Sequence, residues 1–430
     1  MADRSGTTWI LRFAPAVLLG LLGVQQALAT NHFPDLFIYR AGSELGLRGE
    51  SPYNIALIRQ ITSAQFPDDS PQEDSFILNC GYFLPPMAAL VFAPFAALAW
   101  PAAKVAWGIV IGFAAAGIAS LPDLFQKSGA EPPIRTGVLS LIVRFSLVLN
   151  PLALAIAIVG QVTVVSVGCV VVGLWCISYN RPVLGAVLWS VVFVKPHVAL
   201  PLIPLAWYLG GWKPAAILVA LVAGLNLLGA TVMGGSPLFL KDYFDYLPTG
   251  HKAVLYNQAE RNPQITSWNR LLISCGGPPI ELSAITTIAG YLVWGGLVVG
   301  RCAVTGRRPP APWAGAAAVS GAVVCSQVLV YELLMLVIAV PWIRDLFAAR
   351  RLVWGWTAVL FLVIQTIPIN GTSPVLDFYR PGGALAFALL VLLGPIAPEL
   401  LPLSPSLQSG EHCPAPVARQ DEPGFTTRCP

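Results

Sequence analysis

The chain has 430 residues, of which 56% are hydrophobic and only 11% are charged, with a net charge of +4. Soluble domains average about 25% charged residues. This composition therefore excludes a soluble enzyme, and it also excludes a disordered chain and a nucleic-acid binder, because both need a high density of charge. The remaining class is a polytopic membrane protein, and a chain of this length could hold roughly ten to thirteen spans of about 20 residues each.

The N-terminal part predicts one membrane span and then a large outer loop. Basic residues precede an apolar run over 13–29. We interpret this run as a retained first span, although a cleaved signal peptide would show the same pattern. The polar stretch 30–83 holds more acidic than basic residues. Because positive charge is retained on the cytoplasmic side of a membrane, we predict that 30–83 lies on the outer side.

Apolar segments alternate with short breaks along the rest of the chain. A second outer loop is predicted at 234–282, and the tail 401–430 is predicted to be disordered and cytoplasmic because Pro, Ser and Gly dominate it. Residues 1–400 would form one membrane-embedded domain. The predicted segments are a re-entrant piece at 85–100 leading into a span that ends near 121, spans at 138–158, 162–177, 215–233, 283–300, 352–369 and 384–397 with an outer loop at 370–383, and two pairs of short segments, 182–194 with 198–209 and 313–325 with 333–342.

This order predicts an all-α polytopic membrane protein with about 12 transmembrane helices, including short Pro-broken and re-entrant segments, and with both ends in the cytoplasm. Irregular segments at membrane depth are tolerated only where they line protein or a watery cavity. Each short pair has a polar turn on its predicted outer side, at Lys195 in the first pair and at Glu332 in the second. The short pairs therefore indicate a polar site.

The ionisable residues of these turns each have two interpretations. Lys195, with His197 two positions later, is the one cation between Arg181 and Lys213. It could stabilise a lipid phosphate as a leaving group, or its amine could extend to the lipid head groups. Glu332 is an ionisable group near membrane depth, which suggests a function, but an interfacial residue in a wet turn would give the same pattern.

Asp35 lies just after the first predicted span, where a carboxylate would reach a polar head group while the bilayer holds the lipid tail. This position suits a general base that acts on a lipid-linked substrate. Pro34 and Asp35 before an apolar helical run also form a signal for a helix N-cap. Spacing alone favours the cap.

The sequence predicts neither a metal nor a cofactor. The four histidines are dispersed, and the eight cysteines show no CxxC pair and no ligand spacing. The Asp-x-Asp pattern that holds a metal for nucleotide-sugar donors is also missing from the sequence. Only Cys80 and Cys275 fall in large loops on the same predicted side. The sequence leaves open whether these two cysteines form a disulfide.

Short motifs follow one another in a fixed order over residues 33–343. They are Asp35-Leu36-Phe37-Ile38-Tyr39, Ser51-Pro52-Tyr53, Tyr82-Phe83-Leu84-Pro85-Pro86-Met87, Gly160-Gln161-Val162-Thr163, Lys195-Pro196-His197, Trp212-Lys213-Pro214-Ala215, Asp242-Tyr243-Phe244 and Asn257-Gln258. This ordered set resembles the family 87 glycosyltransferases, which are membrane enzymes of the GT-C superfamily that use polyprenyl-phosphate sugars. One departure lies at 326–332, where the family often ends a Ser-Pro-x-Ser-Trp-x-His turn with His and this chain has Glu332.

The resemblance implies transfer of a hexose, with mannose expected, from a polyprenyl-phosphate sugar to an acceptor hydroxyl. The reaction would invert the anomeric centre and take place on the outer face of the plasma (inner) membrane. The resemblance also implies that Asp35 is the catalytic base, which favours the base over the cap. Binding of the donor phosphate is expected from Lys195, His197, Tyr39 and Arg40, and binding of the sugar or acceptor from Gln161, Glu332, Tyr331, Asn257 and Gln258.

The expected partners are the lipid-linked sugar donor, a glycolipid or glycan acceptor, and membrane lipid, with no nucleic acid. The alternative function is a transporter or flippase of lipid-linked sugars. A transporter would share the polar residues at membrane depth but would need no base at Asp35. It also predicts an internal repeat symmetry, which the sequence does not show.

Overall fold

The computed structural model describes residues 4–29, 33–66, 81–125, 138–254, 258, 262, 265–278, 284–306, 309–366 and 374–396. Helices make up nearly all of this part, and its one sheet has two short strands, so the all-α prediction is confirmed. The predicted tail 401–430 lies outside the described residues, as does Cys80. Cys275 is an exposed, free thiol.

Four segments of the described part are long and apolar enough to cross a bilayer, namely Trp100–Asp123, Ser140–Val159, Trp212–Gly234 and Thr286–Thr305. Further apolar helices are shorter than a crossing requires. The chain is thus an integral membrane protein by length and composition of its helices, while the count of about 12 spans stays a prediction. The helices that form the bundle are α1 (Arg4–Ala29), α5 (Met87–Ala96), α6 (Trp100–Ala119), α7 (Val138–Val148), α8 (Pro151–Val159), α9 (Thr163–Ser178), α13 (Trp212–Gly234), α16 (Ala284–Thr305), α19 (Leu352–Gln365) and α20 (Pro374–Leu393).

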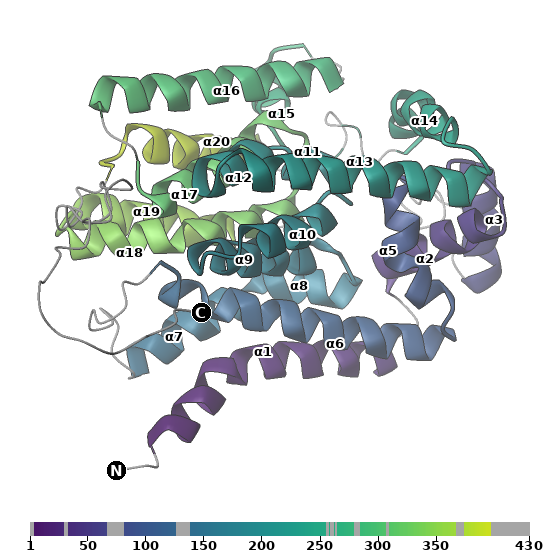
Figure 1. Cartoon of the computed structure of the whole chain (residues 1–430), viewed down its shortest axis with the longest axis horizontal. Coiled ribbons are helices and arrows are strands. Elements are labelled where there is room, and N and C mark those ends of the chain that lie inside the picture. Colours follow the sequence, from purple (N-terminus) through teal and green to yellow (C-terminus); the bar gives the residue numbers. More distant parts are fainter. Residues whose placement is uncertain are drawn as a thin grey trace, which may run out of the picture. The chain divides into compact units, whose positions relative to one another are not determined.

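Helix α1 packs lengthwise along α6, as Figure 1 shows, and glycines allow the two backbones to approach. A Cβ added to Gly20 would lie 3.1 Å from Cα of Gly112, and one added to Gly108 would lie 2.8 Å from Cγ2 of Val24. Small residues permit such packing inside a bilayer, where apolar side chains gain nothing by leaving lipid for protein. The first predicted span is therefore an integral part of the bundle.

The segment predicted as one span at 138–158 is divided into α7 and α8. Asn150 begins α8, because its side-chain oxygen accepts a hydrogen bond of 2.8 Å from the N–H of Ala153. Pro151 then occupies the first helical position, where its missing N–H has no cost. This cap and proline start a new helix within an otherwise continuous apolar run.

The regions predicted as outer loops contain regular structure. Helices α2 (Pro34–Leu47) and α3 (Ile55–Gln65) lie within 30–83, and α14 (Phe239–Ala253), β1 (Ile265–Thr266) and α15 (Trp268–Ser274) lie within 234–282. The predicted loop at 370–383 is also wrong in part, since α20 begins at Pro374. Hydropathy alone misses such helices because they bury one face and remain polar on the other.

A group of aromatic rings joins α14 to the first of these regions. The ring of Tyr53 lies 5.7 Å from Phe239, 5.5 Å from Tyr243 and 5.4 Å from Tyr246, measured between centroids. The hydroxyl of Tyr53 donates a hydrogen bond of 3.2 Å to the carbonyl of Leu84. We call the end of the bundle that carries α2, α3 and α14 the site end, because the candidate site below includes α2.

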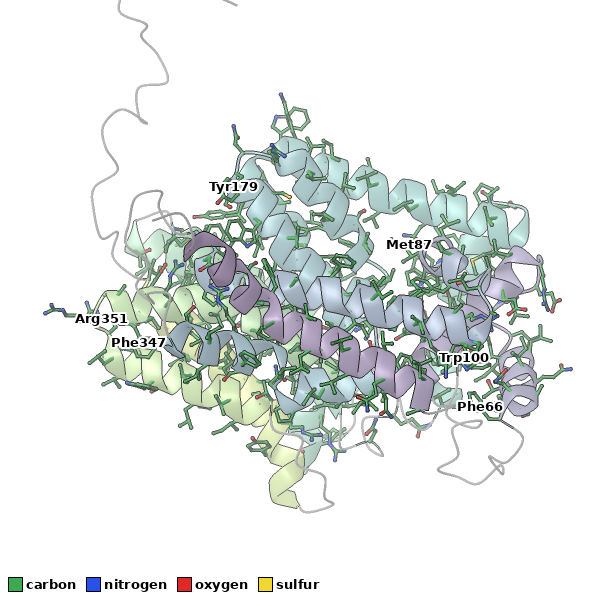
Figure 2. All side chains as sticks on the ribbon, turned by 90° about the horizontal axis from the view of Figure 1, so that it is seen from below. Phe66, Met87, Trp100, Tyr179, Phe347 and Arg351 are labelled. Atoms are coloured by element: carbon green, nitrogen blue, oxygen red, sulfur yellow. The ribbon has the colours of Figure 1, made fainter. Side chains whose placement is uncertain are left out.

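The opposite end of the bundle carries η1 (Leu121–Asp123) and the junction of α18 (Val340–Ala348) with α19. Arg144 makes two hydrogen bonds of 2.8 Å to the carboxylate of Asp123. Figure 2 shows Trp100 at the site end and Tyr179 and Arg351 at the opposite end. Exposed residues such as Tyr179 and Arg351 are typical of the boundaries of a bilayer, where aromatic and basic side chains anchor a membrane protein.

Both predicted pairs of short segments are present. The first consists of α10 (Pro182–Val192), the single turn α11 (Pro196–Ala199) and α12 (Leu202–Gly210). In the second, α17 (Ala311–Cys325) is followed by β2 (Val328–Leu329), the 3-10 helix η3 (Val330–Ala339) and α18. The helix predicted at 333–342 therefore begins earlier, at Val330, and its first part is a 3-10 helix. Strand β2 pairs with β1 in the antiparallel register Ile265↔Leu329, which ties the second outer region to η3.

Candidate active site

Asp35 lies in the first turn of α2 and is not its N-cap. Phe33 occupies the cap position, without a side-chain cap hydrogen bond, and Pro34 starts the helix. Asp35 is a half-buried residue, and its carboxylate makes no hydrogen bond to the described part of the chain. The cap interpretation that spacing favoured is therefore not supported, and the carboxylate remains available for chemistry.

Gly160 positions the start of α2 beside the Gly160–Thr163 motif. This glycine ends α8 with a φ of +74°, and a Cβ added to it would lie 2.6 Å from Cδ1 of Phe33 and 3.1 Å from Cβ of Leu36. Only glycine combines a left-handed backbone with so close an approach. The residues on either side of Asp35 thus pack directly against the end of α8.

A chain of polar contacts connects this motif to both short pairs. The side-chain oxygen of Gln161 accepts hydrogen bonds from the N–H of Thr163 at 3.1 Å and from its hydroxyl at 3.0 Å. The ammonium group of Lys195 lies 3.2 Å from the hydroxyl oxygen of Thr163 and forms an ion pair with Oε1 of Glu332. The two polar turns that were predicted separately therefore meet, and we name Asp35, Gln161, Thr163, Lys195 and Glu332 the polar cluster.

The ion pair between Lys195 and Glu332 is almost entirely removed from solvent. The Lys195 side chain is 7% exposed and that of Glu332 is 2% exposed. A buried ion pair seldom adds to stability, because both charges lose their hydration. Oε2 of Glu332 is also buried without a hydrogen-bond partner. Glu332 is thus a buried charged group with one carboxylate oxygen that lacks a hydrogen bond, and such a group suggests a role in function. This burial is not consistent with the wet interfacial turn that the sequence also allowed.

Asp35 belongs electrostatically to the polar cluster. Burial raises the pKa of this carboxyl from 3.8 to about 7, while the positive charge of Lys195 lowers the pKa and the negative charge of Glu332 raises it. Both charged groups of the ion pair therefore lie close enough to Asp35 to affect its ionisation. A carboxylate with a pKa near neutrality is suited to take a proton from a hydroxyl and later to release it.

Tyr39 and Tyr331 are two tyrosines close to the polar cluster. Tyr39 lies one helical turn after Asp35 on the same face of α2, and its side chain is buried. Burial raises its pKa well above the usual value, and Asp35, Glu332 and Tyr331 contribute to that rise. The Tyr39 phenol therefore stays protonated and can donate a hydrogen bond to an anion.

The other predicted site residues lie in different settings. Arg40 donates hydrogen bonds of 3.3 and 3.2 Å to the carbonyls of Phe95 and Leu98, so its guanidinium group holds the end of α5. His197 is half-buried two positions after Lys195, and its carbonyl accepts a hydrogen bond from Tyr291. Asn257 lies outside the described residues.

Gln258 is half-buried, and its carbonyl accepts a hydrogen bond of 2.9 Å from the N–H of Asn262. Its expected role in binding sugar or acceptor stays a prediction.

Thr163 is a member of the polar cluster that the sequence analysis did not select. The motif Gly160-Gln161-Val162-Thr163 contained it, but a single threonine at the start of an apolar helix gives no separate signal. Its place between Gln161 and Lys195 depends on the packing of α9 against the α10 turn. Only its position in a motif of the resembled family could have pointed to it.

Lys195 of the polar cluster lies between two helices that are too short to cross a bilayer. Helix α10 has 11 residues and α12 has 9, which at about 1.5 Å per residue corresponds to lengths near 16 and 14 Å. A hydrocarbon core is about 30 Å thick. Each helix of this hairpin is therefore about half as long as a hydrocarbon core is thick.

These features define a membrane protein with a buried polar site between short helices. The family model for glycosyltransferase family 87 matches residues 82–331, which is more than half of the chain. The chain therefore belongs to glycosyltransferase family 87, and it is a membrane glycosyltransferase. Searches of curated proteins and of solved structures gave no significant match. The matched region includes Gln161, Thr163 and Lys195, while Asp35 and Glu332 lie outside it.

Substitution of Gly160 tests how the start of α2 is positioned. We predict that Gly160→Ala lowers stability by about 1–3 kcal/mol through its strained backbone and lowers turnover about 100-fold, because a displacement of about 1 Å is enough for such a loss. Gly49→Ala is the matched control, since Gly49 has a φ of +76° but nothing within 4 Å of an added Cβ. Equal turnover in the two folded variants would show that the contact with Phe33 is unimportant.

The pH dependence of turnover tests the ionisation of Asp35. A base is active only when ionised, and the pKa of Asp35 is raised to about 7. Turnover at saturating donor should therefore rise about tenfold per pH unit below this value and level off above it. Glu44→Gln is the control, because Glu44 lies on the same helix and pairs with the exposed Arg48. Constant turnover from pH 5 to pH 7 would exclude Asp35 as the titrating base.

Proposed function

We propose that this glycosyltransferase transfers a hexose, with mannose expected, from a polyprenyl-phosphate sugar to an acceptor hydroxyl in a GT-C type fold. The observation that carries the proposal is the position of Asp35, a carboxylate without a hydrogen bond beside a buried lysine. A lipid-linked donor enters such a site from the bilayer, with its phosphate at the depth of Lys195.

The reaction is a single displacement at the anomeric carbon. The acceptor oxygen forms the new bond while its proton passes to Asp35. The bond between the anomeric carbon and the phosphate oxygen breaks, and its electron pair leaves with the polyprenyl phosphate. Attack and departure occur on opposite sides of the sugar, so the configuration inverts. Alignment of the two substrates supplies a large part of the rate enhancement.

Lys195 stabilises the phosphate as its negative charge increases during departure. Thr163 and Glu332 hold the ammonium group in place before the donor binds. We assign Tyr39 and His197 as further groups for the phosphate, and Gln161, Tyr331 and Glu332 as groups for the sugar. We leave Arg40 out of the donor site because its guanidinium group contacts the end of α5.

A transfer assay separates this function from the transport alternative. Purified protein is incubated with radiolabelled polyprenyl-phosphate mannose and candidate glycolipid acceptors, and both products are quantified. The proposal predicts one polyprenyl phosphate released for each sugar transferred. A flippase would move the donor across a vesicle membrane without releasing any polyprenyl phosphate.

We place the site end of the bundle on the outer side of the membrane. Basic residues follow the helices at the opposite end, including Arg181 before α10, Lys213 at the start of α13 and Arg351 before α19. Since positive charge marks the cytoplasmic side, the site end would be the outer end.

Cysteine labelling tests this orientation. In a cysteine-free background, a membrane-impermeant reagent added to intact cells should label Lys241→Cys at the site end and should not label Lys213→Cys. Lys241 is a suitable position because its side chain is 75% exposed. Labelling of the Lys213→Cys protein before permeabilisation would reverse the orientation.

A further inference from the structure

Tyr291 of α16 contacts both segments that carry the buried ion pair. Its hydroxyl donates a hydrogen bond to the carbonyl of His197, two positions after Lys195. The same hydroxyl oxygen lies 3.3 Å from Oγ of Ser326, six positions before Glu332. One side chain from a third helix therefore joins the two polar turns from outside the polar cluster.

The carbonyl of His197 depends on a donor from another helix. Leu200 has a φ of −48° and a ψ of −42°, and Pro201 has a φ of −64° and a ψ of −13°, so the backbone after His197 is helical. In a helix this carbonyl would accept a hydrogen bond from the N–H four positions later. That position is Pro201, which has no N–H. Because carbonyls inside a protein are almost always paired, the hydroxyl of Tyr291 supplies the bond that the proline cannot.

Close packing of α16 against α17 brings Tyr291 to this point. A Cβ added to Gly290 would lie 3.2 Å from Cβ of Cys325, the last residue of α17. Trp294, about one turn further along α16, donates a hydrogen bond of 2.9 Å to the carbonyl of Ala317. Two hydrogen bonds from one face of α16 thus attach this helix to the bundle, and the bond from Tyr291 reaches the turn of the active-site lysine.

We propose that Tyr291 is a positioning residue of the active site, which holds the turn of Lys195 against the segment of Glu332. The proposal rests on the proposed function, since it takes Lys195 to stabilise the departing phosphate. Without the hydroxyl of Tyr291, the carbonyl of His197 loses its partner and this turn can shift. A displacement of about 1 Å can lower a rate about 100-fold, so the turn must be held closely.

Steady-state kinetics of Tyr291→Phe test this role, because the change removes only the hydroxyl. Transfer from polyprenyl-phosphate mannose is measured over a range of donor concentrations and normalised to folded protein. We expect kcat to fall about 10- to 100-fold with little change in the donor KM, the pattern of an interaction that acts mainly in the transition state. A role in stability alone would reduce the folded fraction and leave both constants unchanged.

Tyr208→Phe is the matched control. The hydroxyl of Tyr208 also donates a hydrogen bond to a backbone carbonyl, that of Pro309, but Tyr208 lies near the end of α12 that is remote in sequence from Lys195. This variant should keep the kcat of the wild type.

A second substitution tests the route through the carbonyl of His197. Pro201→Ala restores an N–H four positions after His197, in a backbone whose helical angles direct it toward this carbonyl. The double variant Tyr291→Phe/Pro201→Ala should regain most of the lost kcat, and Pro201→Ala alone should match the wild type.

The outcomes separate this proposal from the function on which it rests. A kcat of Tyr291→Phe equal to that of the wild type would overturn the proposal, and so would an equal loss in Tyr208→Phe. A double variant as slow as Tyr291→Phe would also overturn it, because the carbonyl of His197 would then not be the route. The proposed function would survive each of these results. It fails if the wild-type protein transfers no sugar from the donor.

Discussion

Asp35→Asn should lower the rate of sugar transfer by about 100- to 10,000-fold, the usual cost of removing a general base. Asn keeps the size of the side chain and most of its hydrogen-bonding ability, but it cannot accept the proton of the acceptor hydroxyl. The fold should be unaffected, because Asp35 makes no hydrogen bond to the described chain and is not the N-cap of α2. The measurement is turnover of labelled donor, normalised to folded protein in detergent.

The comparison with Asp35→Ala distinguishes a base from a structural role. If Asp35 served only to stabilise the start of α2, Asn would substitute well and Ala would lose about 1 kcal/mol. We predict instead that both variants fold and that both lose transfer. Transfer close to that of the wild type in Asp35→Asn, with a loss only in Asp35→Ala, would reject the catalytic role.

Lys195→Met should have the second large effect, on stability as well as on transfer. Removal of one partner of a buried ion pair typically costs about 3–5 kcal/mol, because the other charge is left without compensation. Here that charge is Glu332, which is 2% exposed. Thermal unfolding of the purified protein should show the loss of stability, and transfer should be lost in whatever fraction remains folded.

A double variant separates the two effects of Lys195. In Lys195→Met/Glu332→Leu both charges are replaced by apolar groups, a change that is often neutral or stabilising at a buried pair. The double variant should regain most of its stability but none of its transfer, because nothing then offsets the charge of the leaving phosphate. Recovery of transfer together with stability would show that Lys195 serves only the fold.

Much of the bundle could be predicted from the sequence, because apolar runs and prolines determine where membrane helices start and end. The short pair around Lys195 was predicted from this pattern. The helices within 30–83 and 234–282 did not, since α14 buries one face against Tyr53 and stays polar on the other. Amphipathic helices of this kind resemble loops in a hydropathy profile.

Most residues of the polar cluster, but not Thr163 and not their arrangement, were selected from the sequence. Asp35, Lys195 and Glu332 were each selected from their predicted depth or from the resemblance. The ion pair joins residues 137 positions apart, and no local pattern shows that two turns meet. For Asp35 the spacing favoured a helix cap, whereas the tertiary contact of Phe33 with Gly160 determines where α2 begins.

A single displacement with Asp35 as the base inverts the anomeric centre, so the configuration of the product distinguishes it from a double displacement. Purified protein is supplied with a polyprenyl-phosphate sugar of known anomeric configuration, and the new linkage is assigned by NMR from the coupling constants of the anomeric carbon and proton. We predict a linkage whose anomeric configuration is opposite to that of the donor. A product that retains the donor configuration would require a second displacement and would contradict the account.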